Sequence, residues 1–340
     1  MEISNYYFAR LDLKEQSAYQ ILSEAMARGE ESVRLPSLSG DSVREILRAI
    51  RYERPDLFFV DFKHISYTQT PLSVTAHPRY RIRGAALDST REKVRREMDR
   101  ILAAAGRASP RSEQGKCRWV HNYLIKNVHY QTEAMGHSEQ FPEAFSIDGV
   151  FLNHAAVCEG IAKAFQILCR RLGVSVMIVS GAASAPQIGE ARIEQAQAHA
   201  WNIASIQGRP VHIDATWDNN LSVSSRRARY DYFCVPDVWI RQDHIFQAVP
   251  PCTAAEFSYF AAQGVCFSSP RQLKAYLKDA LEKRSEVLYF KLIGDNLPAD
   301  VVGRTDSIVK QALEQFTPGS YRMELIFNPG QFCFFYRISQ

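Results

Sequence analysis

The spacing of apolar residues predicts two helices and three strands in the first part of the chain. Residues 13–28 have helical spacing, and so do residues 41–52, where we expect Asp41 to cap the helix. Residues 32–36 have the pattern of a short strand, and residues 57–84 that of two strands joined near the segment QTP. The pattern therefore predicts a small domain that mixes helices and strands.

A charged helix is predicted next, at residues 88–105. Its segment REKVRREMDR alternates bases and acids, which is typical of a solvated helix face rather than of a binding patch. The stretch GRASPRSEQG (106–115) that follows is the best linker candidate in the chain.

The far end of the chain shows the same order of elements. Residues 268–286 predict a helix with a serine cap and Pro270 at its first position. The later elements are predicted to be a strand, a helix and two strands around the turn NPGQ, at 287–294, 305–316, 321–327 and 332–338. Two related flanking domains would explain this order, although small α+β domains also converge on it. Different strand orders at the two ends would exclude the relationship.

The length of 340 residues exceeds the usual size of one hydrophobic core. We expect three domains: an N-terminal α+β domain at 1–105, a central domain at 106–250 and a C-terminal α+β domain at 251–340.

The central third contains a cysteine at a predicted helix start. From Gly160 onward the apolar positions have helical spacing, and Gly173 is placed to close the helix. Cys158 therefore lies at or just before the first turn, where free N–H groups and the helix dipole favour a thiolate. Cys169, further along the same helix, lacks this help and is expected in the core.

Three strands are predicted after this helix. The first is residues 174–181, and residues 199–205 and 210–216 are expected to form a hairpin around Gly208. Pro210 is tolerated as the first residue of its strand.

The hairpin register decides whether two polar side chains meet. With an even-length loop, His199 lies opposite Thr216, and Asp214 is a diagonal neighbour on the same face. An odd-length loop would place His199 and Asp214 on opposite faces. The spacing permits a His–Asp pair without establishing one.

Each of these residues has a structural alternative. A lone cysteine is most often core, and a histidine or an aspartate near a strand usually has a structural role. The order of Cys158, His199 and Asp214 changes this, because a thiolate nucleophile needs a base, and the base needs a partner that fixes its tautomer.

Composition and charge argue against several classes of protein. The chain is 46% hydrophobic and 23% charged, with a net charge of only +4 and its bases mixed with acids, so we expect no nucleic-acid partner. No apolar stretch has the length of a signal peptide or a membrane span, so we expect a cytoplasmic protein without a membrane partner.

The cysteines indicate free thiols. The chain has seven, an odd number, scattered and without a C-x-x-C pair. We therefore expect neither a disulfide framework nor a zinc site.

Two segments of the central third resemble the core of the transglutaminase-like superfamily, which has a papain-like thiol-hydrolase fold. They are VCEGIAKAFQILCRRLGV (157–174) and HAWNIASIQGRPVHIDATWD (199–218), and the resemblance covers roughly residues 115–250. It implies an α+β fold, in which the helix that bears the nucleophile packs on an antiparallel sheet, flanked by two smaller α/β domains. It also implies Cys158 as nucleophile, His199 as general base and acid, and Asp214 as the orienting carboxylate.

A third segment, RYDYFCVPDVWIRQDH (229–244), is similar to the stretch that follows the triad in bacterial members. The matching residues are Tyr232, Phe233, Asp243 and His244. Ile161 and Ala215 depart from the bacterial pattern but lie outside the triad. The segment QIGEARIE (187–194) is too poor in carboxylates for the calcium loops of animal transglutaminases, and zinc-binding cysteines are missing, so we expect no metal and no cofactor.

The resemblance implies acyl transfer from peptide or carboxamide bonds of a protein or peptide substrate, through a thioester released by water or by an amine. The Cys158 backbone N–H is the natural oxyanion donor, and Asn153 or the turn 145–150 are candidates for the second. Trp201 and Trp217 either wall the site or pack in the core.

His154 and His212 are two further histidines near the predicted triad. His154 falls one turn before Cys158 but has no paired acid, so it is the weaker candidate for the base. His212 shares a face with Asp214 and is expected to be either a supporting partner or a surface residue.

Three function classes stay open: a cysteine hydrolase, a transamidase that joins glutamine to lysine, and a silent binding or scaffold protein. The intact set of Cys158, His199 and Asp214 counts against the third class. We favour the hydrolase because the resemblance is to bacterial-type members, most of which look like hydrolases rather than crosslinking enzymes.

Overall fold

The computed structural model describes residues 3–184, 196–247, 249–294, 297–317 and 319–339. The chain divides into two compact units. The first comprises residues 1–179, 200–210 and 214–216, and the second comprises residues 180–199, 211–213 and 217–340. Helices and strands are mixed along the whole chain, as predicted for an α+β protein. The predicted domain limits at 105/106 and 250/251 stay predictions.

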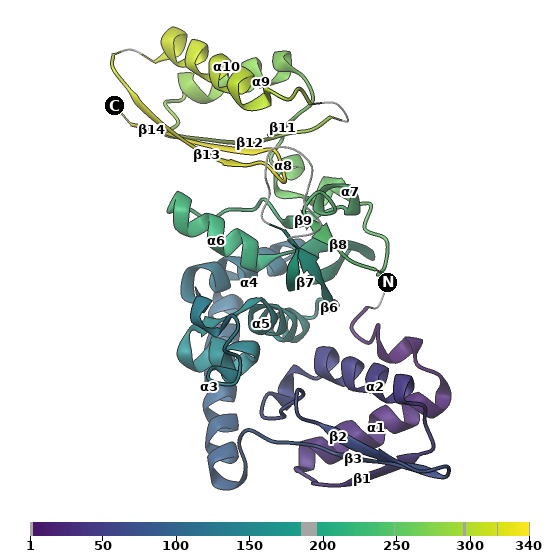
Figure 1. The fold of residues 1–340 in the computed structure, drawn as a ribbon. Helices are drawn as coiled ribbons and strands as arrows, with labels where there is room; N and C mark the ends of the chain where they lie inside the picture. Colours follow the sequence, from purple (N-terminus) through teal and green to yellow (C-terminus); the bar gives the residue numbers. More distant parts are fainter. Residues whose placement is uncertain (1–2, 185–195, 248, 295–296, 318, 340) are drawn as a thin grey trace. The chain divides into compact units, whose positions relative to one another are not determined.

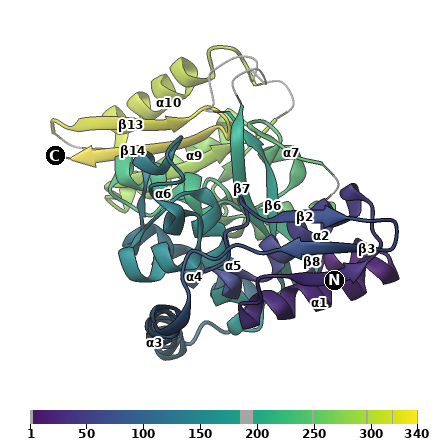
Figure 2. The same ribbon diagram turned by 60° about the horizontal axis from the view of Figure 1, so that its bottom comes forward.

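The first unit begins with two helices and a three-stranded sheet, which lie against each other (Figures 1 and 2). The sheet is antiparallel with the order β1-β3-β2. The elements are α1 (Leu13–Arg28), β1 (Val33–Pro36), α2 (Gly40–Glu53), β2 (Ser66–Gln69) and β3 (Ser73–His77). All five predicted elements are confirmed.

The predicted cap of α2 is wrong. The Ser39 side chain, not Asp41, accepts a hydrogen bond from the Ser42 amide at 3.0 Å. Asp41 lies within the first turn and forms an ion pair with Arg44 three residues later. A serine two positions earlier competes for the cap because serine and aspartate cap helices about equally well.

Two long helices shorten the predicted linker. Helix α3 runs over Gly84–Ala108 and α4 over Glu113–Asn127, so only four residues of the stretch 106–115 lie between them. Ser109 is left-handed, with φ 47°, and ends α3, while the Ser112 side chain caps α4. The stretch looked like a linker because its serines, which serve as helix ends, also mark loops.

Helix α5 (Cys158–Arg171) packs on the central sheet, as the resemblance implied. The buried Asn202 amide donates to the Ala162 carbonyl of α5 at 3.0 Å and to the Met177 carbonyl of strand β6 (Val176–Ala183) at 3.3 Å. The fourth residue of the segment HAWN therefore joins a helix and two strands. Cys169 is fully buried, as predicted.

The central sheet has five strands in the order β10-β6-β7-β8-β9, and it contributes residues to both units. Its strands are β6 (Val176–Ala183), β7 (Gln197–Ile206), β8 (Arg209–Ile213), β9 (Phe233–Val235) and β10 (His244–Ile245).

The predicted hairpin is confirmed, with a turn of two residues. Gln207 and Gly208 have φ values of 52° and 76°. Two positive φ values in a two-residue loop are what a type I′ turn requires, and this turn matches the twist of the strands. The loop is therefore even, which is the first of the two cases considered from the sequence.

The end of the second hairpin strand was predicted three residues too late. β8 ends at Ile213, and Ala215 begins helix α6 (Ala215–Ser225). Thr216 is therefore helical and does not pair with His199 across a strand. The Asp214 carboxylate accepts a hydrogen bond from the Thr216 amide at 2.9 Å, which is how an aspartate starts a helix.

The second unit ends in a four-stranded sheet with the order β11-β12-β14-β13. Its strands are β11 (Cys266–Phe267), β12 (Val287–Leu292), β13 (Arg322–Asn328) and β14 (Cys333–Ser339). Helices α9 (Pro270–Glu282) and α10 (Val301–Phe316) lie on one face of it (Figure 1). The Ser269 cap and Pro270 at the first helical position are confirmed.

The remaining elements are short. They are η1 (Phe8–Arg10), η2 (Pro55–Leu57), β4 (His129–Tyr130), η3 (Thr132–Ala134), η4 (Pro142–Phe145), the π-helical turn η5 (Gly149–Asn153), β5 (Ala155–Ala156), α7 (Asp237–Ile240), η7 (Ala255–Phe257) and α8 (Tyr259–Ala262).

The two end sheets have the same strand order. In chain order the strands of the first sheet pair as first-third-second, and β12, β13 and β14 pair in the same way, antiparallel in both cases. The order therefore does not exclude a relationship between the two ends, which stays a prediction.

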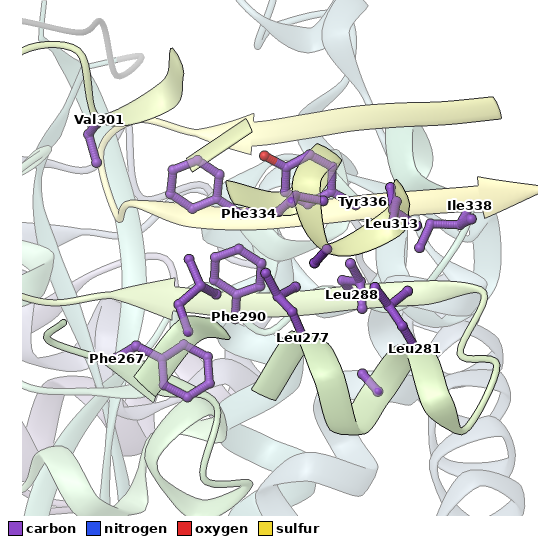
Figure 3. Packing of buried hydrophobic residues seen from close by; sticks show 14 residues of the cluster. Phe267, Leu277, Leu281, Leu288, Phe290, Val301, Leu313, Phe334, Tyr336 and Ile338 are labelled. Carbon is purple, nitrogen blue, oxygen red and sulfur yellow. The ribbon is translucent and has the colours of Figure 1, made fainter. Parts of the chain in front are cut away.

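An apolar cluster fills the space between α9, α10 and the C-terminal sheet (Figure 3). Phe290 of β12 stacks on Phe334 of β14 with ring centroids 5.4 Å apart, and Leu277 and Leu281 come from α9. This cluster supplies the apolar burial that holds the sheet and helices together.

In the part of the chain that the structure describes, every helix is too short or too polar to cross a lipid bilayer. All seven cysteines are free thiols, as predicted.

Phe290→Ala should lower the free energy of unfolding by about 3–5 kcal/mol, because it removes a fully buried ring and leaves a cavity. Leu72→Ala is the matched control, since Leu72 is 83% exposed and its loss should cost less than about 0.5 kcal/mol. Urea unfolding of the full chain measures both. Equal midpoints for the two variants would contradict this account of the core.

Candidate active site

Cys158 is the first residue of helix α5 and is half-buried. Val157, which precedes it, offers no side-chain cap to the helix. The first amides of a helix have no intrahelical acceptor, and the helix dipole places partial positive charge there. The position therefore leaves backbone N–H groups for a ligand oxygen beside the thiol.

Gly160, the last residue of the segment CEG, allows the helix start to sit against the loop before it. A Cβ at this position would overlap the Ala144 carbonyl oxygen and would lie 3.2 Å from that of Ser146. Val157 also donates its amide to the Ala144 carbonyl at 3.0 Å. The glycine is thus needed for a close backbone approach that fixes where the helix begins.

Glu159 is held by two cations and has a structural role. Its carboxylate accepts from the Arg51 Nε atom of α2 at 2.7 Å and from the Lys163 Nζ atom at 2.8 Å. Burial by itself raises the pKa of Glu159, but the charges of Lys163 and Arg51 outweigh burial and lower that pKa to about 2. The carboxylate is therefore ionised at neutral pH and ties the first turn of α5 to α2. Burial lowers the pKa of Lys163, and Glu159 opposes this.

Tyr130 lies close to Cys158 and Asp214 in the first unit. Burial raises the pKa of the Tyr130 hydroxyl, and its electrostatic interactions with Cys158 and Asp214 raise that pKa further. Strand β4, which carries Tyr130, pairs in parallel with β5, so that Tyr130 lies beside Ala156, two residues before Cys158. The structure therefore brings Cys158 and Asp214 within electrostatic reach of one hydroxyl group.

Ala200, the residue after His199, shares an apolar cluster with Cys158. Ala200 of β7 belongs to a small apolar cluster with Ala162 and Ile178, and Cys158 packs against it. His199 itself is 9% exposed, and its ring lies 5.9 Å from the Trp217 ring in the second unit. Asp214 is fully buried.

The other candidates from the sequence have different surroundings. Trp201 is fully buried, in keeping with core packing, whereas Trp217 is partly exposed beside His199. Asn153 and His154 are both exposed, and α5 begins after His154, as predicted. The roles of Asn153 and Trp217 stay predictions.

His212 is not a surface residue. It is fully buried, its Nε2 atom lies 2.8 Å from the Asp237 Oδ1 atom, and its ring packs on Phe246 at 4.9 Å. His212, Asp237 and Cys252 each offer a ligand atom within 4.8 Å of the others, so these residues could hold a metal ion. However, burial raises the pKa of the Cys252 thiol, and a metal would need the thiolate. The segment 187–194, whose sequence is too poor in carboxylates for a calcium site, lies outside the described residues.

A cavity of about 310 Å³ in the first unit lies beside Glu159 and Lys163. Lys63 also lines it, with its Nζ atom 4.8 Å from the centroid of the Phe145 ring. Cys158 is not among its lining residues, so this cavity is separate from the thiol.

The comparisons with known proteins concern the middle of the chain. Residues 100–215 match the family model of the transglutaminase-like superfamily. Residues 100–215 belong to the transglutaminase-like superfamily.

A relative of this transglutaminase-like segment is kyphoscoliosis peptidase of Mus musculus, 27% identical over 111 residues, which are 32% of this chain and 16% of the mouse protein. The match thus spans about one sixth of the mouse protein. A solved structure of a TGase aligns with a TM-score of 0.31 and 13% identity, over 54% of this chain and 50% of that chain.

Reasoning from the sequence missed Tyr130 of the transglutaminase-like segment. It follows an exposed histidine in a two-residue strand, and no spacing rule connects it with Cys158. The parallel pairing of β4 with β5 brings the two together, and parallel pairing joins segments that are distant in sequence.

Glu159→Gln should lower the free energy of unfolding of the first unit by about 3–5 kcal/mol at neutral pH, because it leaves Arg51 and Lys163 without their shared carboxylate. Urea unfolding measures this. Glu139→Gln is the matched control, since the Glu139 side chain is 72% exposed and its loss should cost less than about 0.5 kcal/mol.

The same pair of variants tests the pH dependence. The pKa of Glu159 is lowered from 4.5 to about 2 in the folded chain, so its contribution is complete above pH 4.5 and disappears as the pH falls toward 2. The gap in stability between the wild type and Glu159→Gln should narrow over this range. A gap that stays constant from pH 6 to pH 2 would contradict the ion pair.

Proposed function

We propose that this protein is a cysteine-dependent acyl-transfer enzyme, a hydrolase of peptide or carboxamide bonds in proteins or peptides. In this proposal Cys158 is the nucleophile, His199 is the general base and acid, and Asp214 orients the imidazole. The observation that carries the proposal is the half-buried Cys158 thiol at the first residue of α5, where the helix end favours a thiolate.

The reaction proceeds in two steps. His199 accepts the thiol proton, the Cys158 sulfur attacks the carbonyl carbon, and the oxyanion takes hydrogen bonds from N–H groups at the start of α5. The C–N bond then breaks, the imidazolium gives its proton to the leaving amine, and a thioester remains. Water attacks the thioester, His199 accepts a water proton, and the C–S bond breaks to give the acid and the free thiol.

The Glu159 and Gly160 contacts support this reaction without taking part in it. They fix the start of α5, so the thiol and the helix amides keep one geometry. A fixed set of donors stabilises an oxyanion better than one that must reorganise.

Hydrolysis rather than transamidation is the favoured outcome. The transglutaminase-like relative from mouse is called a peptidase, and the match with it covers 16% of that protein.

Iodoacetamide should label Cys158 about tenfold faster than Cys266 at pH 7, because the helix start favours the Cys158 thiolate. Cys266 is the internal comparison, since it is also half-buried but burial raises the pKa of its thiol, with Lys291 opposing. Peptide mapping by mass spectrometry measures both rates. Cys158→Ala should remove the fast site and Cys266→Ala should keep it. Equal rates at the two thiols would refute an activated Cys158.

Cys158→Ala and His199→Ala should abolish turnover, while Asp214→Asn should keep a small residue, about 10⁻⁴ of the wild-type rate. Asparagine keeps an oxygen that can accept from the Thr216 amide, so the start of α6 should survive. Turnover is followed on an unfolded glutamine-rich protein as peptide cleavage, ammonia release and incorporation of a fluorescent amine. Incorporation of the amine without cleavage would replace the hydrolase by a transamidase, and full activity of either alanine variant would overturn the triad.

A further inference from the structure

A second buried imidazole lies against His199. His244, the first residue of β10, has its ring centroid 5.4 Å from that of His199, and the two rings meet edge to face at 62°. A ring nitrogen of each lies within 4.8 Å of the other. Trp217 packs on both, with its ring centroid 4.6 Å from His244 and 5.9 Å from His199. The His199 ring therefore packs directly on His244 and Trp217.

The His244 ring is itself held by a carboxylate. Its Nδ1 atom lies 2.6 Å from the Oδ1 atom of Asp243, and both side chains are at most 1% exposed. The nitrogen can only donate to an ionised carboxylate, so the neutral ring carries its proton on Nδ1. Asp243 thus fixes both the tautomer and the plane of the ring.

The second oxygen of Asp243 is held by two neutral donors. The Tyr232 hydroxyl donates to Oδ2 at 2.7 Å, and the Gln331 side-chain amide donates to the same atom at 3.1 Å. Both donors are fully buried. With both oxygens occupied, the carboxylate cannot rotate without breaking a hydrogen bond.

Gln331 comes from the turn between β13 and β14, almost ninety residues after Asp243. The Gln331 side-chain amide also donates to the Trp239 backbone carbonyl at 3.0 Å. The Gln331 backbone carbonyl accepts from the buried Lys291 ammonium of β12. The turn is therefore fixed on both sides. Through Gln331 the C-terminal sheet holds the Asp243 carboxylate.

Tyr232 has a parallel connection to the same sheet. The Asn328 side chain donates to the Tyr232 oxygen at 3.2 Å and to the Asp231 carboxylate at 2.9 Å. Asp231 forms two hydrogen bonds with the buried Arg229, at 2.9 and 2.8 Å, and accepts a third from the Tyr289 hydroxyl. A continuous buried polar network thus runs from β12, β13 and the β13–β14 turn to His244.

Such a network is a poor way to add stability. Burying charges costs several kcal/mol per ion, and apolar residues of the same volume often stabilise a core equally well or better. The network contributes fixed geometry instead, because each member has only one arrangement that satisfies its donors and acceptors.

We propose that His244 is a positioning residue for His199, and that the C-terminal sheet sets its position through Gln331, Tyr232 and the Asp243 carboxylate. The inference rests on the proposed role of His199 as the base. It gives the C-terminal part of the chain a function in catalysis, since the orientation of the base depends on a hydrogen bond donated from the β13–β14 turn.

The test uses the full chain with Gln331→Met, which keeps the side-chain length and removes the donor to Asp243. The matched control is Gln311→Met, at an exposed position of α10. His244→Asn is the direct variant, and Tyr232→Phe provides a second donor loss if His244→Asn fails to fold. Circular dichroism and urea unfolding check that each variant is folded.

Two readouts are needed. The first is the rate of Cys158 alkylation by iodoacetamide, which should fall about tenfold in Gln331→Met and stay unchanged in Gln311→Met. The second is the nitrogen NMR spectrum of the histidine side chains, in which the His199 and His244 signals should shift in Gln331→Met and not in the control. A purely structural Gln331 would lower stability without moving the His199 signals.

A folded Gln331→Met protein with wild-type His199 signals and wild-type alkylation would overturn the proposal. The two proposals can also fail separately. If Cys158 of the wild type reacts no faster than Cys266, the proposed enzyme activity fails, but a shift of the His199 signals in Gln331→Met would still support the positioning role.

Discussion

The burial of the Glu159 carboxylate between Arg51 and Lys163 is the constraint on which the first unit depends. An ionised carboxylate inside a protein must be matched by cations and by donors, or it costs more than the fold can supply. Because one cation comes from α2 and the other from the next turn of α5, this pairing fixes where α5 begins relative to the N-terminal helices. The close approach of Gly160 to the Ala144 carbonyl fixes the same point from the other side. These contacts place Cys158 at the start of α5, and its side chain packs on the apolar cluster with Ala162 and Ile178.

In the second unit a buried carboxylate, Asp243, likewise holds a neighbouring side chain, the His244 imidazole. Asp243 is buried with each oxygen occupied, and it fixes the ring of His244, which packs on His199. Two buried carboxylates thus prepare two different groups, a thiol at a helix start and an imidazole on a strand. In both places the hydrogen bonds of a buried carboxylate hold the neighbouring group in one geometry.

The sequence predicted most of the elements and misjudged their ends. Helical spacing located α1, α2, α5, α9 and α10, because an apolar stripe with a period of 3.6 residues is a strong local signal. The hairpin at Gln207 and Gly208 was also predictable, since the turn is set by two adjacent residues. The errors lie where one side chain can serve two elements. Asp214 reads as the end of a strand and acts as the start of α6, and the serines at 109 and 112 read as a linker and act as helix ends.

What the sequence determined by itself was local: the position of Cys158 at a helix start, the hairpin that carries His199, and the order of Cys158, His199 and Asp214. Periodicity and turn chemistry act over a few residues, so they can be read without the fold. Only the tertiary structure brought Tyr130 beside Cys158, paired Arg51 with Glu159, and connected Gln331 with Asp243. These contacts join residues from about 30 to more than 100 positions apart, and hydrogen bonds over such separations depend on packing that no local pattern records.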